Sequence, residues 1–163
     1  MGIFVLNLNS SMINLILFGK PGSGKGTQAE FVKKKYGLIH ISTGDVFRYN
    51  ISKKTELGLL AKSYMEKGDL VPDNVTIKML EAEVNKSPHA NGFIFDGFPR
   101  TESQAVALDK LMTKFDTSIS GMIALEVDDE ILIERLLERG KVSGRADDSN
   151  LSLIHISEPT SPY

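Results

Sequence analysis

The sequence predicts an α/β fold in which helices cover both faces of a parallel, doubly wound sheet. Short apolar runs of strand length alternate along the chain with longer segments that show helical periodicity. Apolar runs without polar alternation are typical of strands that are buried on both faces, as in parallel sheets. The chain has 163 residues, 41% apolar and 25% charged, which suits a single globular domain.

Four runs are predicted as strands because they are short, apolar and bounded by glycine. They are Asn14–Phe18, Leu38–Ile41, Gly92–Asp96 and Gly121–Val127. Parallel strands of this kind place their carboxyl ends at one edge of the sheet, where ligands bind. We therefore expect the functional residues directly after these runs.

Helices are predicted between and after the strands. They cover Lys25–Tyr36, a segment from Asp73 to about Asn85 with Asp73 as candidate cap, a segment around 105–115, and Asp129–Gly140. In the last segment, Ile131, Leu132, Leu136 and Leu137 form the predicted apolar face. The mostly helical stretch 42–71 interrupts the alternation and is interpreted as an inserted flap.

Composition and charge exclude several classes of protein. The net charge is −2, from 19 basic and 21 acidic residues without a long run of one sign, which argues against binding to nucleic acid or to a membrane surface. Without cysteine, neither a disulfide nor a thiolate zinc site can form. No apolar run approaches the roughly 20 residues that span a bilayer. We expect a cytoplasmic monomer.

A glycine-rich loop joins the first predicted strand to the first predicted helix. Its sequence, Gly19-Lys-Pro-Gly-Ser-Gly-Lys25-Gly-Thr27, has the strand–loop–helix context of a phosphate-binding loop. Glycines let backbone N–H groups turn toward an anion, and the helix dipole adds positive potential. Lys25 is predicted to reach the β- and γ-phosphates of a nucleotide, and Thr27 to face the metal. The alternative is an ordinary glycine-rich turn with an exposed lysine.

With Gln28, this G-x-P-G-x-G-K-G-T-Q pattern resembles the nucleoside monophosphate kinases, with Gly26 at the position where other phosphate-binding loops have Ser or Thr. The resemblance covers 12–150 and implies a P-loop kinase fold with five parallel strands, four of which are recognised here. It assigns ATP to the loop and to two arginines of the last helix. The residues expected to bind ATP are Gly22, Ser23, Gly24, Lys25, Gly26, Thr27, Arg135 and Arg139.

The third predicted strand leads into Asp96-Gly-Phe-Pro-Arg100-Thr-x-x-Gln104. Asp96 is at the carboxyl end of its strand and is predicted to hold Mg, directly or through water. The guanidinium of Arg100 suits phosphate oxygens. Alternatively, Asp96 caps the next helix and Arg100 is merely solvated.

The resemblance is specifically to the adenylate kinases, because Ser42-Thr43-Gly-Asp45-Val-Phe-Arg48 carries Thr43 where relatives that prefer UMP or CMP usually have Ala. It implies that Thr43 contacts the AMP adenine, Arg48 and Arg100 its phosphate, and Gln104 the edge of the base. Thr43 could instead only cap the following helix. The residues expected to bind AMP are Thr43, Arg48, Asp69, Leu70, Val71, Gly97, Phe98, Pro99, Arg100, Gln104 and Arg145.

Arg135 and Arg139 are four residues apart on the last predicted helix, so they share a face. Considered alone, the segment is an ordinary amphipathic surface helix. The resemblance implies instead that one arginine neutralises the transferring phosphoryl group while the other faces ATP, and that 140–149, with Arg145, forms a short lid. The expected catalytic residues are Lys25, Arg100, Arg135, Arg139 and Arg145.

The implied reaction is ATP + AMP ⇌ 2 ADP with Mg, in which positioning and charge neutralisation are the tasks of the protein. A phosphate acceptor is already an anion and needs no general base. The alternatives are a UMP/CMP kinase, a GTPase-like switch and a non-catalytic nucleotide-binding fragment. A GTPase is disfavoured because no N-K-x-D motif is present and Gly26 follows Lys25. The three histidines share no motif and receive no role.

Both ends of the sequence differ from the pattern of the family. Residues 1–11 precede Met12 and are interpreted as an N-terminal extension, and 151–163 as a tail from outside the family. We expect the C-terminal part, with a fifth strand and a closing helix, to be missing. The strand at 121–127 would then be an apolar edge, and the chain would be weakly active or inactive.

Overall fold

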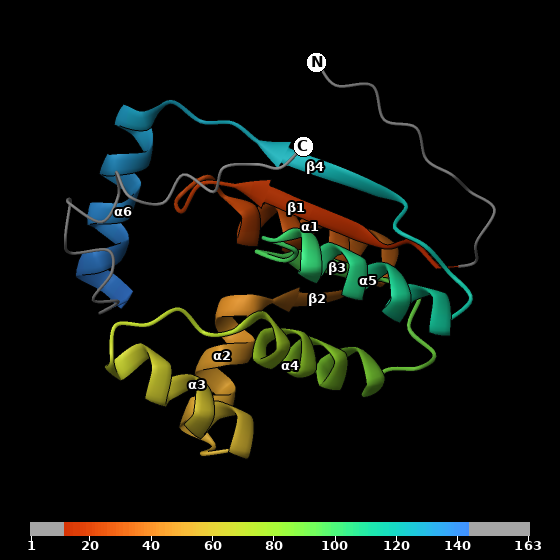
Figure 1. Cartoon of the computed structure of the whole chain (residues 1–163). Coiled ribbons are helices and arrows are strands. Elements are labelled where there is room, and N and C mark those ends of the chain that lie inside the picture. Colours follow the sequence, from red (N-terminus) through yellow and green to blue (C-terminus); the bar gives the residue numbers. More distant parts are fainter. Residues whose placement is uncertain (1–11, 144–163) are drawn as a thin grey trace.

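The computed structural model describes residues 12–143, which form four strands and six helices (Figure 1). The strands are β1 (Leu15–Gly19), β2 (Ile39–Ser42), β3 (Phe93–Asp96) and β4 (Gly121–Leu125). The helices are α1 (Lys25–Tyr36), α2 (Thr43–Ser52), α3 (Glu56–Glu66), α4 (Asp73–Asn85), α5 (Glu102–Lys114) and α6 (Asp129–Ser143). The extension 1–11, the tail 151–163 and most of the predicted lid lie outside the described residues.

All four strands pair in parallel, in the order β2-β3-β1-β4. The chain starts near the middle of the sheet and moves outward in both directions, which confirms the doubly wound α/β fold. The register places Ser42 beside Asp96, and Asp96 beside Leu17. The carboxyl ends of β1, β2 and β3 therefore share one edge. Within the described residues, β4 is the last strand on its side of the sheet.

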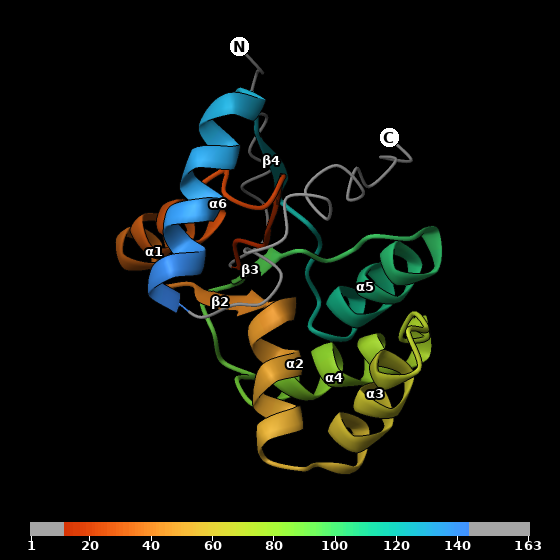
Figure 2. The same ribbon diagram turned by 90° about the vertical axis from the view of Figure 1, so that its left-hand side faces the viewer.

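Two layers of helices cover the sheet. Figure 2 shows α1 on one side of the strands and α4 and α5 on the other, while α6 stands beyond the carboxyl ends of the strands (Figure 1). On the α1 side, Ala29 packs with Leu15, Leu17 and Ile94 in one buried cluster. The α4 and α5 side is the larger core, and its fully buried members include Met79, Val84, Phe93, Phe95 and Met112.

The flap predicted at 42–71 consists mainly of α2 and α3, which pack on each other and on α4. The residue that caps α2 is Ser42, whose hydroxyl accepts the N–H of Asp45 at 3.5 Å. The alternative that Thr43 is the cap is therefore wrong. Thr43 is the first helical residue, and its side chain is free to bond elsewhere.

Helix α4 begins at the predicted residue, but Asp73 does not cap it. The capping position is occupied by Pro72, which offers no side-chain acceptor. The carboxylate of Asp73 instead accepts hydrogen bonds from the start of α5. Because α4 and α5 cover the same face of the sheet, this contact joins their N-terminal ends.

Helix α6 stands beside the edge at which β1 and β4 end (Figure 1). Leu132 and Leu136 are buried, and Leu137 is partly buried. The prediction that Ile131 belongs to the same apolar face is wrong, since its side chain is 42% exposed. The predicted lid starts inside this helix, because 140–143 are still helical.

Candidate active site

The glycine-rich loop connects β1 to α1 at the carboxyl edge of the sheet. Gly24 occupies the capping position of α1 with φ of 91°, a left-handed conformation that a residue with a Cβ rarely adopts. Glycine has no side chain that could cap the N-terminal N–H groups of α1. The loop thus presents backbone donors and the positive end of a helix dipole, which together suit an anion.

The side chain of Ser23 supplies a further polar group in this loop. Its hydroxyl oxygen is buried and has no hydrogen-bond partner among the residues that the structure describes. A buried hydroxyl without a partner is unfavourable, and a phosphate oxygen would satisfy it. This observation and the left-handed glycine indicate that the loop fits the phosphates of ATP.

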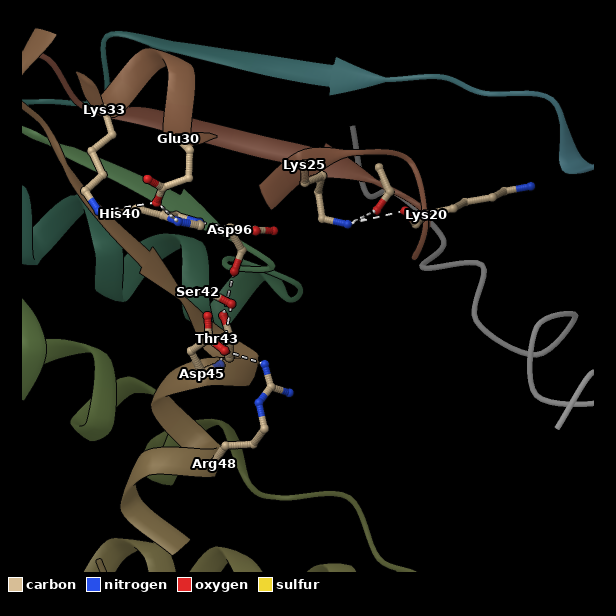
Figure 3. A network of polar contacts seen from close by, with 11 residues as sticks. Lys20, Lys25, Glu30, Lys33, His40, Ser42, Thr43, Asp45, Arg48 and Asp96 are labelled. Atoms are coloured by element: carbon tan, nitrogen blue, oxygen red, sulfur yellow. Dashed lines mark hydrogen bonds and ion pairs between the residues drawn. The ribbon is translucent and has the colours of Figure 1, made fainter. Parts of the chain in front are cut away.

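Lys25 turns its ammonium back over the loop. Its Nζ donates hydrogen bonds to the carbonyl oxygens of Gly19 at 2.7 Å and Lys20 at 3.3 Å (Figure 3). Burial lowers the pKa of Lys25, and the positive charges of Arg100 and Arg139 lower it further, while the carboxylate of Asp96 opposes them. Three side chains from three other segments therefore act electrostatically on Lys25.

Asp96 ends β3 and has a side chain that is only 12% exposed. Its Oδ2 lies 3.3 Å from Nε2 of His40, and Nδ1 of that histidine lies 4.0 Å from Oε1 of Glu30 (Figure 3). No role was assigned to His40 from the sequence. Its place beside Asp96 follows from the parallel pairing of β2 with β3, which the sequence alone does not specify. The alternative in which Asp96 caps α5 is wrong, because Thr101 is the cap.

Asp96 provides a single carboxylate as a candidate ligand for Mg. No group of three or more acidic, histidine or cysteine side chains that could hold a metal occurs within 12–143. Mg is usually bound by one or two carboxylates together with water and substrate phosphates, rather than by a cage of protein ligands. A single carboxylate beside a phosphate loop fits that mode.

Thr43, Gly97 and Arg100 come together beside Asp96. The hydroxyl of Thr43 donates to the backbone oxygen of Asp96 at 3.1 Å, and Nε of Arg100 donates to the backbone oxygen of Gly97 at 2.8 Å. A Cβ built on Gly97 would lie 3.0 Å from Nη2 of Arg100 and 3.5 Å from the Thr43 hydroxyl. Three predicted AMP-binding residues are thus in close proximity.

Arg48 is on the same side of the sheet but has a different partner. Its Nη2 contacts Oδ1 of Asp45, one turn earlier on α2, at 2.5 Å (Figure 3). Both side chains are more than half exposed. An exposed ion pair of this kind contributes little stability, so a phosphate can compete for the guanidinium.

Gln104 is held from two sides. Its Oε1 accepts the backbone N–H of Arg100 at 2.8 Å, and its Nε2 donates to Oδ1 of Asp73 at 2.6 Å. The residue is only 6% exposed. The sequence did not predict the Asp73 contact, which follows from the packing of α4 beside α5.

The segment between α3 and α4 contains Asp69, Leu70 and Val71. Leu70 is 93% exposed, whereas Val71 packs against the larger core. An apolar side chain so open to water is available to cover a bound base. Phe98 and Pro99, which are also expected at the AMP site, are buried in the turn after β3.

Two arginines of α6 face the loop. Nη1 of Arg135 donates to the carbonyl oxygen of Gly22 at 3.3 Å, and Arg139 is close enough to lower the pKa of Lys25. Buried Leu136 lies under the same loop, since a Cβ on Gly22 would be 3.2 Å from it. Arg145 lies outside the described residues.

The chain is similar to known proteins over most of its length. The family model of adenylate kinase matches residues 17–156. The chain belongs to the adenylate kinase family. An adenylate kinase of Flavobacterium psychrophilum is 66% identical over 139 residues, covering 85% of this chain and 73% of the relative. One from Flavobacterium johnsoniae is 56% identical over 156 residues, covering 93% and 82%, and one from Parabacteroides distasonis is 56% identical over 143 residues, covering 88% and 75%.

Adenylate kinases transfer a phosphoryl group from MgATP to AMP, and the comparisons favour this function over a UMP/CMP kinase or a non-catalytic module. The family assignment also confirms ATP as the phosphoryl donor and Mg as its metal, as expected from the sequence. The match to the family model ends within the segment 151–163.

Proposed function

We propose that this adenylate kinase chain binds MgATP on the loop 19–25 and AMP beside β3, and transfers the γ-phosphoryl group between them. The observation that supports this best is the electrostatic contact of Lys25 with Asp96, Arg100 and Arg139. A lysine from the donor loop, two arginines and one carboxylate suit a highly charged phosphoryl group and its metal.

On the donor side, backbone N–H groups of 22–27 and the Lys25 ammonium bind the phosphates. The ammonium exchanges its carbonyl partners at Gly19 and Lys20 for phosphate oxygens. Arg135 and Arg139 approach from α6, and Asp96, with Thr27, holds the metal. Mg supplies charge neutralisation between the phosphates when it is bound.

On the acceptor side, AMP occupies the space between the flap and the turn 97–100. Arg100 and Arg48 bind its phosphate, Thr43 and Gln104 contact its base, and 69–71 close over it. Arg48 leaves its ion pair with Asp45 to bind the phosphate. Breaking this pair costs little free energy, because both groups are exposed.

The chemistry needs no general base among these residues. An oxygen of the AMP phosphate attacks the γ-phosphorus, and the bond from that phosphorus to the oxygen bridging the β-phosphate breaks, which gives two ADP. The protein contributes alignment and the positive charges of Lys25, Arg100 and Arg139. Closure of α2 and α3 over the site excludes water, which otherwise competes as acceptor.

We also propose a cytoplasmic monomer that does not bind nucleic acid. No described helix is long and apolar enough to cross a membrane. The net charge of −2 and the absence of a one-sign charge run support the lack of a nucleic-acid site.

The test uses the purified 163-residue chain with ATP, Mg and each of AMP, UMP and CMP. ADP formation is followed by a coupled assay, and nucleotide binding is measured by calorimetry alongside. As inferred from the sequence, we expect turnover of this chain to be weak, with AMP as the preferred acceptor, and Arg100→Ala to abolish it. Faster turnover with UMP or CMP, or full activity of Arg100→Ala, would overturn the proposal.

A further inference from the structure

The side-chain amide of Gln104 has only one acceptable orientation in this structure. The Arg100 backbone N–H can only donate, so the group that faces it must be Oε1. The Asp73 carboxylate, when ionised, can only accept, so the group that faces it must be Nε2. If the amide were turned by 180°, its NH2 group would face the Arg100 N–H, and its oxygen would face the Asp73 carboxylate. Neither pair could form a hydrogen bond.

The charge on Asp73 is secured by its other contacts. Oδ2 accepts the hydroxyl of Thr101 at 2.7 Å and also that of Ser103, while Oδ1 accepts Nε2 of Gln104. These hydrogen bonds, with Ser103 first, lower the pKa of Asp73 despite a smaller opposing effect of burial. The carboxylate is therefore ionised and remains an acceptor near neutral pH.

The fixed orientation leaves a defined pair of groups for a ligand. A glutamine amide has two N–H donors and two oxygen lone pairs, and Asp73 and Arg100 each use one. Among residues 12–143, no group uses the remaining N–H and the remaining lone pair. They match a 6-amino purine, whose N1 accepts a hydrogen bond and whose N6–H donates one.

A 6-oxo purine presents the opposite pattern, because its O6 accepts and its N1–H donates. Only the turned amide would match it. A site whose buried polar groups fit one pattern rejects the other through unpaired groups, which is the most effective form of discrimination by hydrogen bonds.

We propose that Asp73 is a positioning residue that fixes the amide of Gln104 and thereby makes the acceptor site select 6-amino over 6-oxo purine monophosphates. The inference rests on the proposed role of Gln104 at the AMP base. Asp73 itself touches no substrate and acts through Gln104. Arg100 supplies the second restraint through its backbone, which no side-chain substitution removes.

The experiment compares the affinities of AMP and IMP, which differ at C6 and N1 of the base. Both are titrated into the purified chain by calorimetry. In Asp73→Ala we expect the ratio of AMP to IMP affinity to fall about tenfold, the magnitude of one hydrogen bond to a charged group. In Asp73→Asn the ratio should stay within about threefold of wild type, because the amide oxygen of asparagine can still accept from Gln104.

Ser103→Ala is the matched control, since it removes another partner of Asp73 and leaves the Gln104 contact in place. Its ratio should remain that of wild type. If Asp73→Ala does not fold, Asp73→Ser replaces it. The serine hydroxyl lies one bond closer to the backbone than the carboxylate oxygens of Asp73, and it keeps a polar group in the first turn of α4. The same fall in the ratio is expected there.

A purely structural role of Asp73 would lower both affinities equally and leave the ratio unchanged, and this result would overturn the inference. Gln104→Ala distinguishes the positioning role of Asp73 from the role of Gln104 at the base. If Gln104→Ala collapses the ratio and Asp73→Ala does not, only the positioning role fails. If Gln104→Ala leaves the ratio unchanged, the proposed role of Gln104 fails, and the inference fails with it.

Discussion

The ammonium of Lys25 donates a 2.7 Å hydrogen bond to the carbonyl oxygen of Gly19, the last residue of β1. The side chain therefore folds back across the loop in which it is anchored. This geometry holds the charge over the loop, within electrostatic range of Arg100, Arg139 and Asp96, rather than in open solvent. The partners are neutral carbonyls, which an anionic phosphate can displace.

The first prediction concerns this lysine. Lys25→Ala should lower the turnover of ATP and AMP by at least about a thousandfold, the order found when a transition-state charge partner is removed. The free energy of unfolding should change by less than about 1 kcal/mol, because only two hydrogen bonds to backbone oxygens are lost and the burial of a charge is relieved. Coupled assays and urea unfolding measure the two effects.

The control for this substitution is Lys34→Ala, which removes an equal charge from the exposed last turn of α1. Its activity should equal that of wild type. Equal losses in the two variants would show that net charge, and not the position of Lys25, is responsible.

A second prediction concerns a polar residue in the core. Asn14 is fully buried, and its Nδ2 donates to Thr117 Oγ1 at 3.0 Å and to the Ser118 oxygen at 2.9 Å. Its Oδ1 accepts the N–H of Phe93 at 3.2 Å. Asn14→Leu should lower the free energy of unfolding by about 2–4 kcal/mol, because the Ser118 carbonyl and the Thr117 hydroxyl lose the Asn14 donor. The Phe93 N–H then keeps only its bond to the Ile13 oxygen.

Thr117→Val is the comparison for Asn14, since it removes a single hydrogen bond from the same group. Its cost should be about 1 kcal/mol. Equal stability of Asn14→Leu and wild type in urea unfolding would contradict the assigned role of Asn14 as a link between β3 and the segment before β4.

Much of the fold followed from the sequence because apolar runs and glycines mark local structure. The strands lie within one or two residues of the predicted runs, and α1 has its predicted bounds. The order β2-β3-β1-β4 was not predicted, since it depends on packing between distant segments. Packing also explains the wrong assignment of Ile131 to the buried face. Helical periodicity does not show which side of α6 packs against the loop, and Ile131 is exposed.

The site was predicted as a set of residues but not as a set of contacts. The motifs placed Lys25 and Asp96 at one sheet edge, because Asp96 ends β3 and Lys25 follows the loop after β1. They did not show that His40 lies beside Asp96, or that Asp73 and Gln104 are bonded. Such pairs join residues 56 and 31 positions apart in sequence, so neither helical nor strand periodicity reveals them.

A third prediction follows from the lowered pKa of Asp73. A carboxyl group whose pKa is lower in the folded state than in the unfolded state stabilises the fold above the unfolded pKa, near 3.9. This contribution is lost as the pH falls through the folded pKa. The stability difference between wild type and Asp73→Ala should therefore be largest near neutral pH and shrink below about pH 4.

Urea unfolding at pH 7 and at pH 3 measures this difference. Glu102→Ala is the control, because it removes a carboxylate from the first turn of the neighbouring helix α5. The difference in the free energy of unfolding between Glu102→Ala and wild type should be small at both pH values. A gap between wild type and Asp73→Ala that is as large at pH 3 as at pH 7 would show that the carboxylate charge is not involved.

The last prediction concerns Gly97, between β3 and Arg100. Its φ is 77°, and a Cβ there would lie 3.0 Å from Nη2 of Arg100. Gly97→Ala should therefore cost about 1–2 kcal/mol in stability from backbone strain. It should also displace the guanidinium and weaken AMP binding by about tenfold or more, with little change in ATP binding, because the donor loop is a separate segment.

Gly37→Ala isolates the strain from the displacement. Gly37 caps α1 with φ of 65°, far from the AMP residues, and a Cβ there would meet only the side-chain amide of Asn91 at 2.9 Å. Both variants should lose comparable stability, but only Gly97→Ala should lose AMP affinity in calorimetric titrations. If Gly37→Ala weakened AMP binding equally, the effect would come from general destabilisation, and the contact between Gly97 and Arg100 would have no special part in binding the acceptor.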